Sequence, residues 1–298
     1  MLNSSFHYYL GFLSVLIAAI LWGTAGTAAS YSIGLSPIVL STISVGFGGF
    51  IHACLNFNLI VQNYTLLLTY KKEIFCAVIA SICCPLFFYS SVTFAGVSIG
   101  TILSIGCAPL FSVILEWLFD HQKIKRQWLV SFLFGIAGVI LITYTGDIAA
   151  QTSSISQPTH LLGILCGLLS SLSYASYSYI MRKLIQQGIN SRAAMGSIFG
   201  ICAILVLPSL LVTGKNLLLY PINFWVALYI PIVPMFLGYL FFSFGLKRIP
   251  ASQAMTLALV EIPVATLLAV LLLGEKLSGS SYLGLVSIFM CVVLLIRK

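Results

Sequence analysis

Long runs of apolar residues, separated by short polar segments, dominate the pattern of this 298-residue chain. A membrane-spanning helix needs about 20 mostly apolar residues, and the chain contains ten runs of this kind. No run alternates apolar and polar side chains at a period of two, as the strands of a membrane barrel would. Because lipid offers the backbone no hydrogen-bonding partners, each span is predicted to be an α-helix. The predicted spans are residues 9–30, 36–57, 74–95, 97–119, 127–145, 161–182, 191–213, 223–245, 251–273 and 279–297.

The composition also indicates a chain that lies in a bilayer. Sixty per cent of the residues are hydrophobic and only 7% are charged, which is too little charge to cover the surface of a soluble protein of this length. The net charge of +8 does not indicate a nucleic-acid-binding protein, because the basic residues stand in gaps between apolar runs rather than in one solvated patch. The eight cysteines lie in or beside apolar runs without metal-ligand spacing, so packing is predicted for them, with no disulfide, metal or cofactor.

The distribution of Lys and Arg predicts how the spans are oriented. Cytoplasmic segments of membrane proteins are enriched in these two residues. If the N-terminus lies in the cytoplasm, 12 of the 14 Lys and Arg fall inside, and only Lys215 and Lys276 fall outside. Removing one span would destroy this separation. An all-α protein of the inner membrane is therefore predicted, with ten transmembrane helices and both termini in the cytoplasm.

The two halves of the chain resemble each other. The stretch AGVSIGTILSIGCAPLFSVILEWLFDHQKI, from Ala95, aligns without gaps with IPASQAMTLALVEIPVATLLAVLLLGEKLS, from Ile249, and the alignment places Pro109 on Pro263. Duplication of a five-span unit would produce such matches. Because five is odd, the second copy would cross the membrane in the opposite direction, as inverted repeats of secondary transporters do. The predicted organisation is a five-helix repeat over 1–146, an outside linker over 147–160 and a second five-helix repeat over 161–298.

Two motifs carry a resemblance to a known family. The first span contains ILWGTAGTAAS, and the ninth contains LVEIPVATLLAVLLLGEKLSG before a glycine-bearing tenth span, YLGLVSIFMCVVLLI. Over its whole length the chain resembles the EamA-type branch of the drug/metabolite transporter superfamily. The resemblance implies an inverted-repeat carrier of amino acids, amines, nucleotide-like metabolites or other small solutes. Asp120 and His121 stand where the family often has Gly-Glu, and the second span lacks the arginine that many relatives carry, so inferences that depend on that arginine do not apply.

A carboxylate lies deep within one predicted span. Glu261 is about ten residues into the ninth span, which places it roughly 15 Å deep at 1.5 Å per residue. An ionised, unpaired carboxylate at that depth would cost several kcal/mol. Glu261 is therefore predicted to bind a cationic group of a substrate or to carry a coupling proton. The alternative is a protonated side chain that hydrogen-bonds a neighbouring helix. Pro263 and Pro109 each leave a backbone carbonyl without its helical partner, and they are the predicted hinges.

Aromatic and polar residues at helical spacing extend this candidate site. Gln253 lies eight residues before Glu261, near the same helical face. Tyr174 and Tyr177 share a face of the sixth span, and Trp22 is the first-half equivalent of Tyr174. Together they are predicted to line a central cleft, in which aromatic rings would suit ammonium groups; the alternative is ordinary packing between helices. Weaker candidates for substrate binding, in the third and eighth spans, are Tyr89 and Tyr239.

Two other titratable residues receive structural interpretations. Glu116, at the inner end of the fourth span, is expected to snorkel to the surface or to pair with Lys123 and Lys125. His52 has no second ligand at a spacing that would suit a metal ion. Neither residue is assigned to the substrate site.

These features favour a secondary transporter of a small organic metabolite, in the first place an amino acid or amine, with Glu261 as a candidate proton carrier. Nucleoside-like metabolites and drugs are the alternative substrates. No P-loop indicates direct use of ATP. A membrane enzyme is a remote alternative, because it would need clustered acids, histidines or a nucleophile at the interface. A channel would need a ring of charge or a filter loop, and neither is visible in the sequence. The expected partners are the substrate, lipid and protons, without nucleic acid, and the expected state is a monomer or homodimer.

Overall fold

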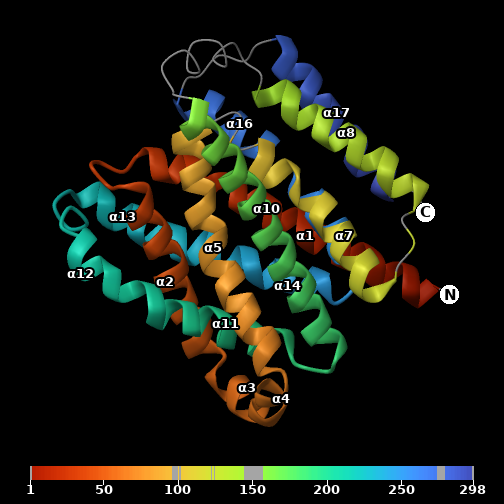
Figure 1. Cartoon of the computed structure of the whole chain (residues 1–298), viewed down its shortest axis with the longest axis horizontal. Coiled ribbons are helices and arrows are strands. Elements are labelled where there is room, and N and C mark those ends of the chain that lie inside the picture. The colour runs from red at the N-terminus through yellow and green to blue at the C-terminus, as the bar shows by residue number, and fades with distance from the viewer. Residues whose placement is uncertain are drawn as a thin grey trace. The chain divides into compact units, whose positions relative to one another are not determined.

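The computed structural model describes residues 2–95, 100, 102–121, 123, 125–143, 157–273 and 279–296. Within these ranges every regular element is a helix (Figure 1). Seven helical segments are long and apolar enough to cross a membrane, so the chain is a multi-pass membrane protein, as predicted. These segments are Phe6–Ser30, Ile38–Leu55, Leu103–Asp120, His160–Gln186, Ser191–Thr213, Pro221–Leu246 and Ala251–Leu272.

The three other predicted spans are helical as well, but they fall outside this set. They correspond to α5 (Lys71–Ala95), α8 (Arg126–Thr143) and α17 (Gly279–Ile296). The apolar parts of α8 and α17 are each shorter than 18 residues. The count of ten spans and the orientation of the termini therefore stay predictions. Of the predicted linker, residues 147–156 lie outside the described ranges, and α10 (Gln157–Gln186) begins in the remainder.

The chain forms two compact units that do not follow the predicted repeats. Unit 1 contains residues 1–82 and 177–250, and unit 2 contains residues 83–176 and 251–298. The division passes through α5 and through α10, and each unit takes residues from both halves of the sequence. Helices from one half therefore bury their apolar faces against helices from the other half.

Close backbone approaches hold unit 1 together. The helix α2 (Pro37–Leu55) begins after Ser36, whose hydroxyl accepts a hydrogen bond from the N–H of Val39 at 3.4 Å. It packs against α11 (Ser191–Val206), and a Cβ on Gly49 would lie only 2.2 Å from the carbonyl oxygen of Phe199. Small residues at such crossings let membrane helices approach closely enough for extensive van der Waals contact.

The eighth predicted span changes its helical winding in the middle. It runs through α13 (Pro221–Ile230), a π-helical segment η3 (Pro231–Gly238) and α14 (Tyr239–Leu246). Two prolines, Pro231 and Pro234, lie in the π segment and cannot donate backbone hydrogen bonds. Their missing N–H groups account for the departure from α-helical pairing, and π segments of this kind recur at functional sites. The same unit includes α1 (Leu2–Ser30), η2 (Leu207–Ser209) and α12 (Leu210–Thr213).

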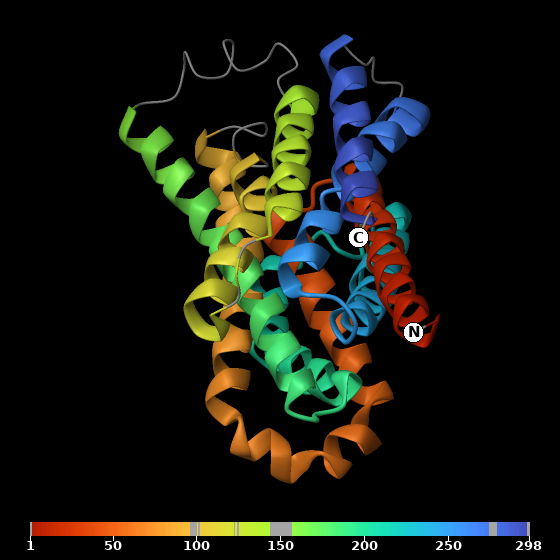
Figure 2. The same ribbon diagram turned by 90° about the vertical axis from the view of Figure 1, so that its right-hand side faces the viewer.

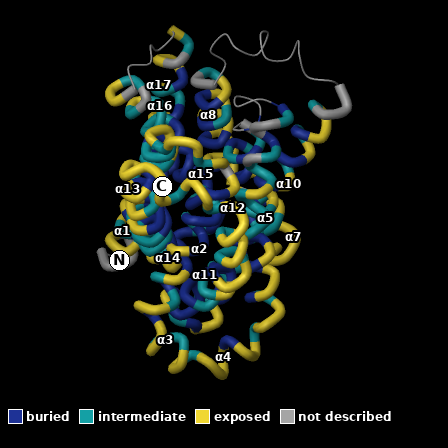
Figure 3. Tube along the Cα trace, turned by 90° about the vertical axis from the view of Figure 1, so that its left-hand side faces the viewer, coloured by how far each residue is buried: buried dark blue, intermediate teal, exposed yellow. Residues whose placement is uncertain are grey.

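Two short helices join α2 to α5. They are α3 (Phe57–Gln62) and α4 (Tyr64–Thr69), and Figure 2 shows them crossing between the ends of the two longer helices. Figure 3 shows both as largely exposed; Leu67 is the one buried residue in the pair. Their position fits an inner connection at the membrane surface rather than a further span.

Unit 2 contains α8, α17 and the interrupted fourth and ninth predicted spans. The fourth consists of η1 (Ile102–Gly106) and α7 (Ala108–Asp120), and the ninth consists of α15 (Ala251–Ala258) and α16 (Glu261–Leu273). α8 and α17 lie side by side in Figure 1, and a Cβ on Gly138 would lie 2.7 Å from the carbonyl oxygen of Gly284. This close approach aligns the two helices along their length.

Candidate functional site

The ninth predicted span is broken immediately before its carboxylate. α15 ends at Ala258, a two-residue turn follows, and α16 begins at Glu261. Pro263 has no N–H and therefore cannot donate to the carbonyl of Leu259. That carbonyl instead accepts a hydrogen bond from the N–H of Ile262 at 3.1 Å. Transporters place substrate and ion sites at such discontinuous helices near the middle of the membrane.

The fourth predicted span is broken at the equivalent position. The π-helical η1 ends at Gly106, and α7 begins at Ala108 with Pro109 as its second residue. At the offset of 154 found in the sequence, Cys107 aligns with Glu261, and Pro109 aligns with Pro263. Each predicted hinge proline thus lies in the first turn of a helix that follows an interruption.

Glu261 has a partly exposed side chain at the start of α16, of which it is the first residue. No residue within the described ranges forms a hydrogen bond or an ion pair with its carboxylate. The thiol of Cys84, on α5, is near enough for an electrostatic interaction with Glu261.

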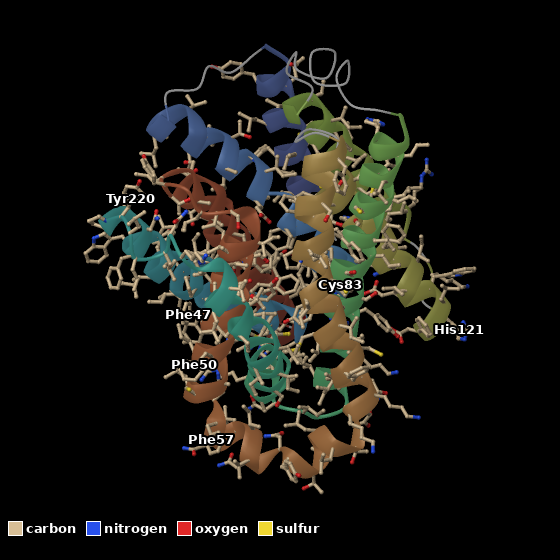
Figure 4. The ribbon with its side chains drawn as sticks, turned by 60° about the vertical axis from the view of Figure 1, so that its left-hand side comes forward. Phe47, Phe50, Phe57, Cys83, His121 and Tyr220 are labelled. Carbon is tan, nitrogen blue, oxygen red and sulfur yellow. The ribbon has the colours of Figure 1, made fainter. Side chains whose placement is uncertain are left out.

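Cys84 is held in place by α10. The hydroxyl of Ser170 donates a hydrogen bond to the carbonyl oxygen of Cys84 at 2.9 Å, and it lies 3.9 Å from the sulfur of the same residue. Pro85 follows inside α5. Figure 4 marks the neighbouring Cys83, at the middle of α5. The surroundings of Glu261 within unit 2 thus include the thiol of Cys84, which Ser170 holds in place.

The other predicted residues of unit 2 are less well defined. Gln253 lies on α15, two turns before the break, and its side chain is partly buried. Tyr174, on α10, is also partly buried. Tyr89 lies on α5, but its side chain is outside the described part of the structure. These three residues stay candidates for substrate binding.

Three predicted aromatic residues meet in unit 1. The ring of Tyr239 lies 5.0 Å from that of Trp22 and 5.7 Å from that of Tyr177, measured between centroids. Phe199 joins them, with its centroid 4.8 Å from that of Tyr239. Trp22 and Tyr177 are only 7% and 3% exposed, and these aromatic rings pack against one another; their role in substrate binding stays a prediction. The hydroxyl of Tyr177 is buried and has no hydrogen-bond partner among the described residues, and a polar ligand could supply one.

Trp22 depends on a glycine in the π segment. A Cβ on Gly238 would lie 2.6 Å from the indole nitrogen of Trp22, so the indole can occupy its position only because residue 238 has no side chain. His52 completes the cluster: its ring stacks on Phe199 at 5.6 Å, and its Nε2 lies 3.4 Å from the carbonyl oxygen of Met235. Among the residues that the structure describes, no three His, Cys, Asp or Glu side chains gather as metal ligands would.

For Glu116, the structure contradicts snorkelling, whereas the expected pairing with Lys123 and Lys125 stays a prediction. The side chain of Glu116 is 4% exposed, and one carboxylate oxygen accepts a hydrogen bond from the N–H of Ser252 at 3.2 Å. Ser252 is the second residue of α15, so Glu116 caps the start of that helix. The signal was present in the sequence, because Glu116 shares one helical face with Pro109, Ser112 and Val113, all of which are buried.

The same buried network extends to α8. The hydroxyl of Thr256 donates a hydrogen bond to the carbonyl oxygen of Ser252 at 2.8 Å, and the indole N–H of Trp128 donates to the hydroxyl of Thr256 at 3.1 Å. α15 is thus fixed by α7 at its start and by α8 one turn later. α16 begins beyond the break and includes exposed residues such as Leu271, at 76%.

Comparisons with known proteins agree with this architecture. The model of the EamA-like transporter family matches residues 9–144 and 161–297. The chain is 30% identical to the uncharacterized transporter YwfM of Bacillus subtilis, over 92% of this chain and 89% of the relative. It is 23% identical to the uncharacterized inner membrane transporter YicL of Salmonella typhimurium, over 96% of this chain and 94% of the relative. A crystal structure with 15% sequence identity has a TM-score of 0.78 and covers 95% of both chains, which shows a similar fold.

Proposed function

Because this chain belongs to the EamA-like transporter family, we propose that it is a secondary active transporter of a small zwitterionic or cationic metabolite, of the amino-acid or amine class. The metabolite would cross the inner membrane by alternating access, through two five-helix repeats of opposite orientation. The observation that carries the proposal is Glu261: a carboxylate at the break of an interrupted helix, with no hydrogen-bond or ion-pair partner among the residues that the structure describes.

The chemistry of this position supports a positively charged ligand. An ionised carboxylate that lies inside a membrane protein without a partner costs several kcal/mol. An ammonium group or a proton would neutralise it. In the proposed cycle, Glu261 holds the ammonium group or the proton on one side and releases it on the other. Anionic substrates are disfavoured, because no Lys or Arg stands in the middle of any predicted span.

The interrupted helices support a mechanism of movement. α15 is fixed by Glu116 and Trp128, whereas α16 lies beyond a turn whose backbone pairing is incomplete. We propose that α16 tilts about this turn and carries Glu261 with it, and that η1 moves in the same way about Cys107 relative to α7. Pro263 and Pro109 would act as the hinges. The aromatic residues Trp22, Tyr177 and Tyr239 are proposed to contact the apolar part of the substrate.

Flux measurements with the purified protein in liposomes test this function. A thermal-shift screen against amino acids, amines and nucleosides first identifies a ligand, and counterflow of that ligand then establishes a carrier. For Glu261→Gln, which removes the charge and keeps the shape, we expect uptake to lose its response to an imposed pH gradient. Counterflow should persist if Glu261 carries the proton only, and it should also fall if Glu261 binds the substrate.

The matched control is Glu73→Gln, which removes the charge of a carboxylate in the first turn of α5, outside the proposed site. This variant should keep both the flux and the pH response. Transport by Glu261→Gln that still responds to the pH gradient, at unchanged substrate affinity, would exclude both proposed roles of Glu261.

A further inference from the structure

The connection between α2 and α5 is free of charged residues. No Asp, Glu, Lys or Arg occurs in the sequence before Lys71, so the two short helices α3 and α4 contain none. A helix on the surface of a water-soluble protein carries charged and polar residues on the face that meets solvent. The composition of this connection therefore does not suit a helix pair that is surrounded by water alone.

The two short helices repeat one pattern. Each is flanked by junction residues, which stand at the regular positions Asn56, Asn63 and Tyr70. The side-chain amides of Asn56 and Asn63 each donate a hydrogen bond at 2.8 Å to the backbone carbonyl four residues earlier. Between the junctions, FNLIVQ of α3 and YTLLLT of α4 have the same order of apolar and polar residues. The two helices therefore have equivalent faces.

The outer surface of α3 has an apolar and a polar side. Phe57 and Val61 stand four residues apart, which places them on one face of a helix, and they are 62% and 57% exposed. Asn58 and Gln62, one position further along, form a second exposed face. The exposed part of α3 is therefore apolar on one side and polar, without charge, on the next.

The second helix has the same arrangement. Tyr64 and Leu68 form its exposed apolar face, at 59% and 49%, and Thr65 and Thr69 form its exposed polar face. Leu67 is buried and fixes α4 against the rest of the chain. An exposed apolar face beside a polar one is the pattern of a helix that lies in the boundary between membrane and water.

The apolar side of α3 continues an exposed apolar row on α2. Phe47 and Phe50 are exposed on this membrane-spanning helix, and Figure 4 shows Phe57 following them along the same side. Lys71 and Lys72 come directly after α4, and both are exposed. Lysines at the end of an apolar segment extend their ammonium groups to the headgroup level. The helix pair thus lies between a surface suited to lipid and two headgroup-level cations.

Two hydrogen bonds connect the helix pair to the loop between α10 and α11. The side-chain oxygen of Asn63 accepts a hydrogen bond from the N–H of Asn190 at 3.2 Å, and the hydroxyl of Tyr70 donates one to the side-chain oxygen of Gln187 at 3.0 Å. Both contacts use junction residues. The apolar faces of α3 and α4 therefore stay exposed while the junctions hold the loop.

We propose that α3 and α4 are interfacial helices, which insert Phe57, Val61, Tyr64 and Leu68 among the lipids at the headgroup level. Aromatic side chains suit this level, and the polar faces of both helices would meet water. Through its two hydrogen bonds, the inserted pair would hold the loop between α10 and α11 at a fixed depth in the membrane. This surface is separate from the proposed transport site and does not depend on the identity of the substrate.

Fluorescence of the full chain in liposomes tests the insertion. An environment-sensitive fluorescent amino acid is encoded at Phe57 in one variant and at Asn58, on the neighbouring polar face, in its matched control. We expect the Phe57 probe to have a blue-shifted emission, to be quenched strongly by phospholipids brominated near the headgroup end of their acyl chains, and to be quenched weakly by aqueous iodide. The Asn58 probe should respond to iodide and little to the brominated lipid.

The second helix gives an independent comparison. Probes at Tyr64 and Thr65 should behave like those at Phe57 and Asn58, and they supply the test if a probe in α3 prevents folding. Quenching of both probes by iodide alone would place the helix pair in water and overturn the proposal. A blue-shifted Phe57 probe that neither quencher reaches would show that protein, and not lipid, covers the apolar face, which would overturn it as well.

Hydrogen exchange in the same liposomes tests the connection to the loop. Tyr70→Phe removes the hydroxyl that donates to Gln187, so the amides of residues 187–190 should exchange several-fold faster than in the native chain. Thr69→Val is the matched control, because the Thr69 hydroxyl donates only to the carbonyl oxygen of Thr65 within its own helix. Native exchange of the loop in Tyr70→Phe would show that the helix pair does not hold it.

Discussion

Single residues in this chain have roles that their sequence neighbours do not reveal. Glu116 and Glu261 are both carboxylates in apolar spans. Glu116 is buried against a helix start, whereas no residue in the described part of the chain pairs with Glu261. The difference lies in what each side chain meets. Glu116 finds the N–H of Ser252, whereas Glu261 opens its own helix after a break. Glu116 is therefore interpreted as structural, and Glu261 is proposed as functional.

The structural role of Glu116 can be measured directly. Glu116→Leu leaves the buried N–H of Ser252 without this acceptor, which should cost about 1–3 kcal/mol of unfolding free energy. Glu116→Gln keeps an acceptor oxygen, so a smaller loss is expected. Thermal or denaturant unfolding in detergent compares the two variants with the native chain. Equal stability of all three proteins would contradict the proposed cap.

At the scale of elements, the two interrupted helices distinguish this molecule from a simple bundle. α7 and α16 both begin beside a proline, and the residues before them form a π turn in one case and a two-residue turn in the other. Hydrogen bonds hold α15 near both of its ends. Glu116 accepts one from the N–H of Ser252, and Trp128 donates one to the hydroxyl of Thr256. A helix fixed before a break and less closely packed after it is suited to bending at the break.

Restoring the missing donor tests the hinge. Pro263→Ala returns an N–H that could pair with the carbonyl of Leu259 and make the span more continuous. We expect the maximal transport rate to fall several-fold while the substrate affinity changes little, because the movement is slowed and the ligand contacts remain. Pro208→Ala, in the exposed η2, is the matched control and should leave the rate unchanged. A native rate for Pro263→Ala would exclude a hinge at this proline.

At the scale of the whole molecule, the two compact units each combine segments from both halves of the sequence. The family model also matches the chain twice, over 9–144 and over 161–297. Each matching segment thus contributes helices to both units. This arrangement fits a duplicated transporter whose halves interleave and do not form separate domains. With the predicted ten spans and opposite repeats, 12 of the 14 Lys and Arg fall on one side of the membrane.

The predicted orientation has a direct test. A green fluorescent protein fused to the C-terminus should fluoresce, because it folds in the cytoplasm, and alkaline phosphatase fused there should be inactive. The same reporters inserted at Lys215, in a predicted outside loop, should behave in the opposite way. Active phosphatase at the C-terminus would show that the count of spans or their direction is wrong.

The sequence by itself determined the class of the protein, its membrane location and its family. These conclusions follow from local properties: an apolar run of sufficient length must become a helix in lipid, and the motifs of the first and ninth spans are contiguous. The sequence also indicated Glu261, because a charge in an apolar run is visible without any knowledge of its neighbours. The two prolines beside the breaks were visible for the same reason.

Only the tertiary structure decided which side chains meet. The ring contacts among Trp22, Tyr177 and Tyr239, and the capping of α15 by Glu116, join residues that are more than 60 positions apart in the sequence. Helical periodicity indicates which residues share a face, but it carries no information about the helix that covers that face. Close packing between helices supplies that information, because a buried carboxylate or ring takes its role from the group against which it packs.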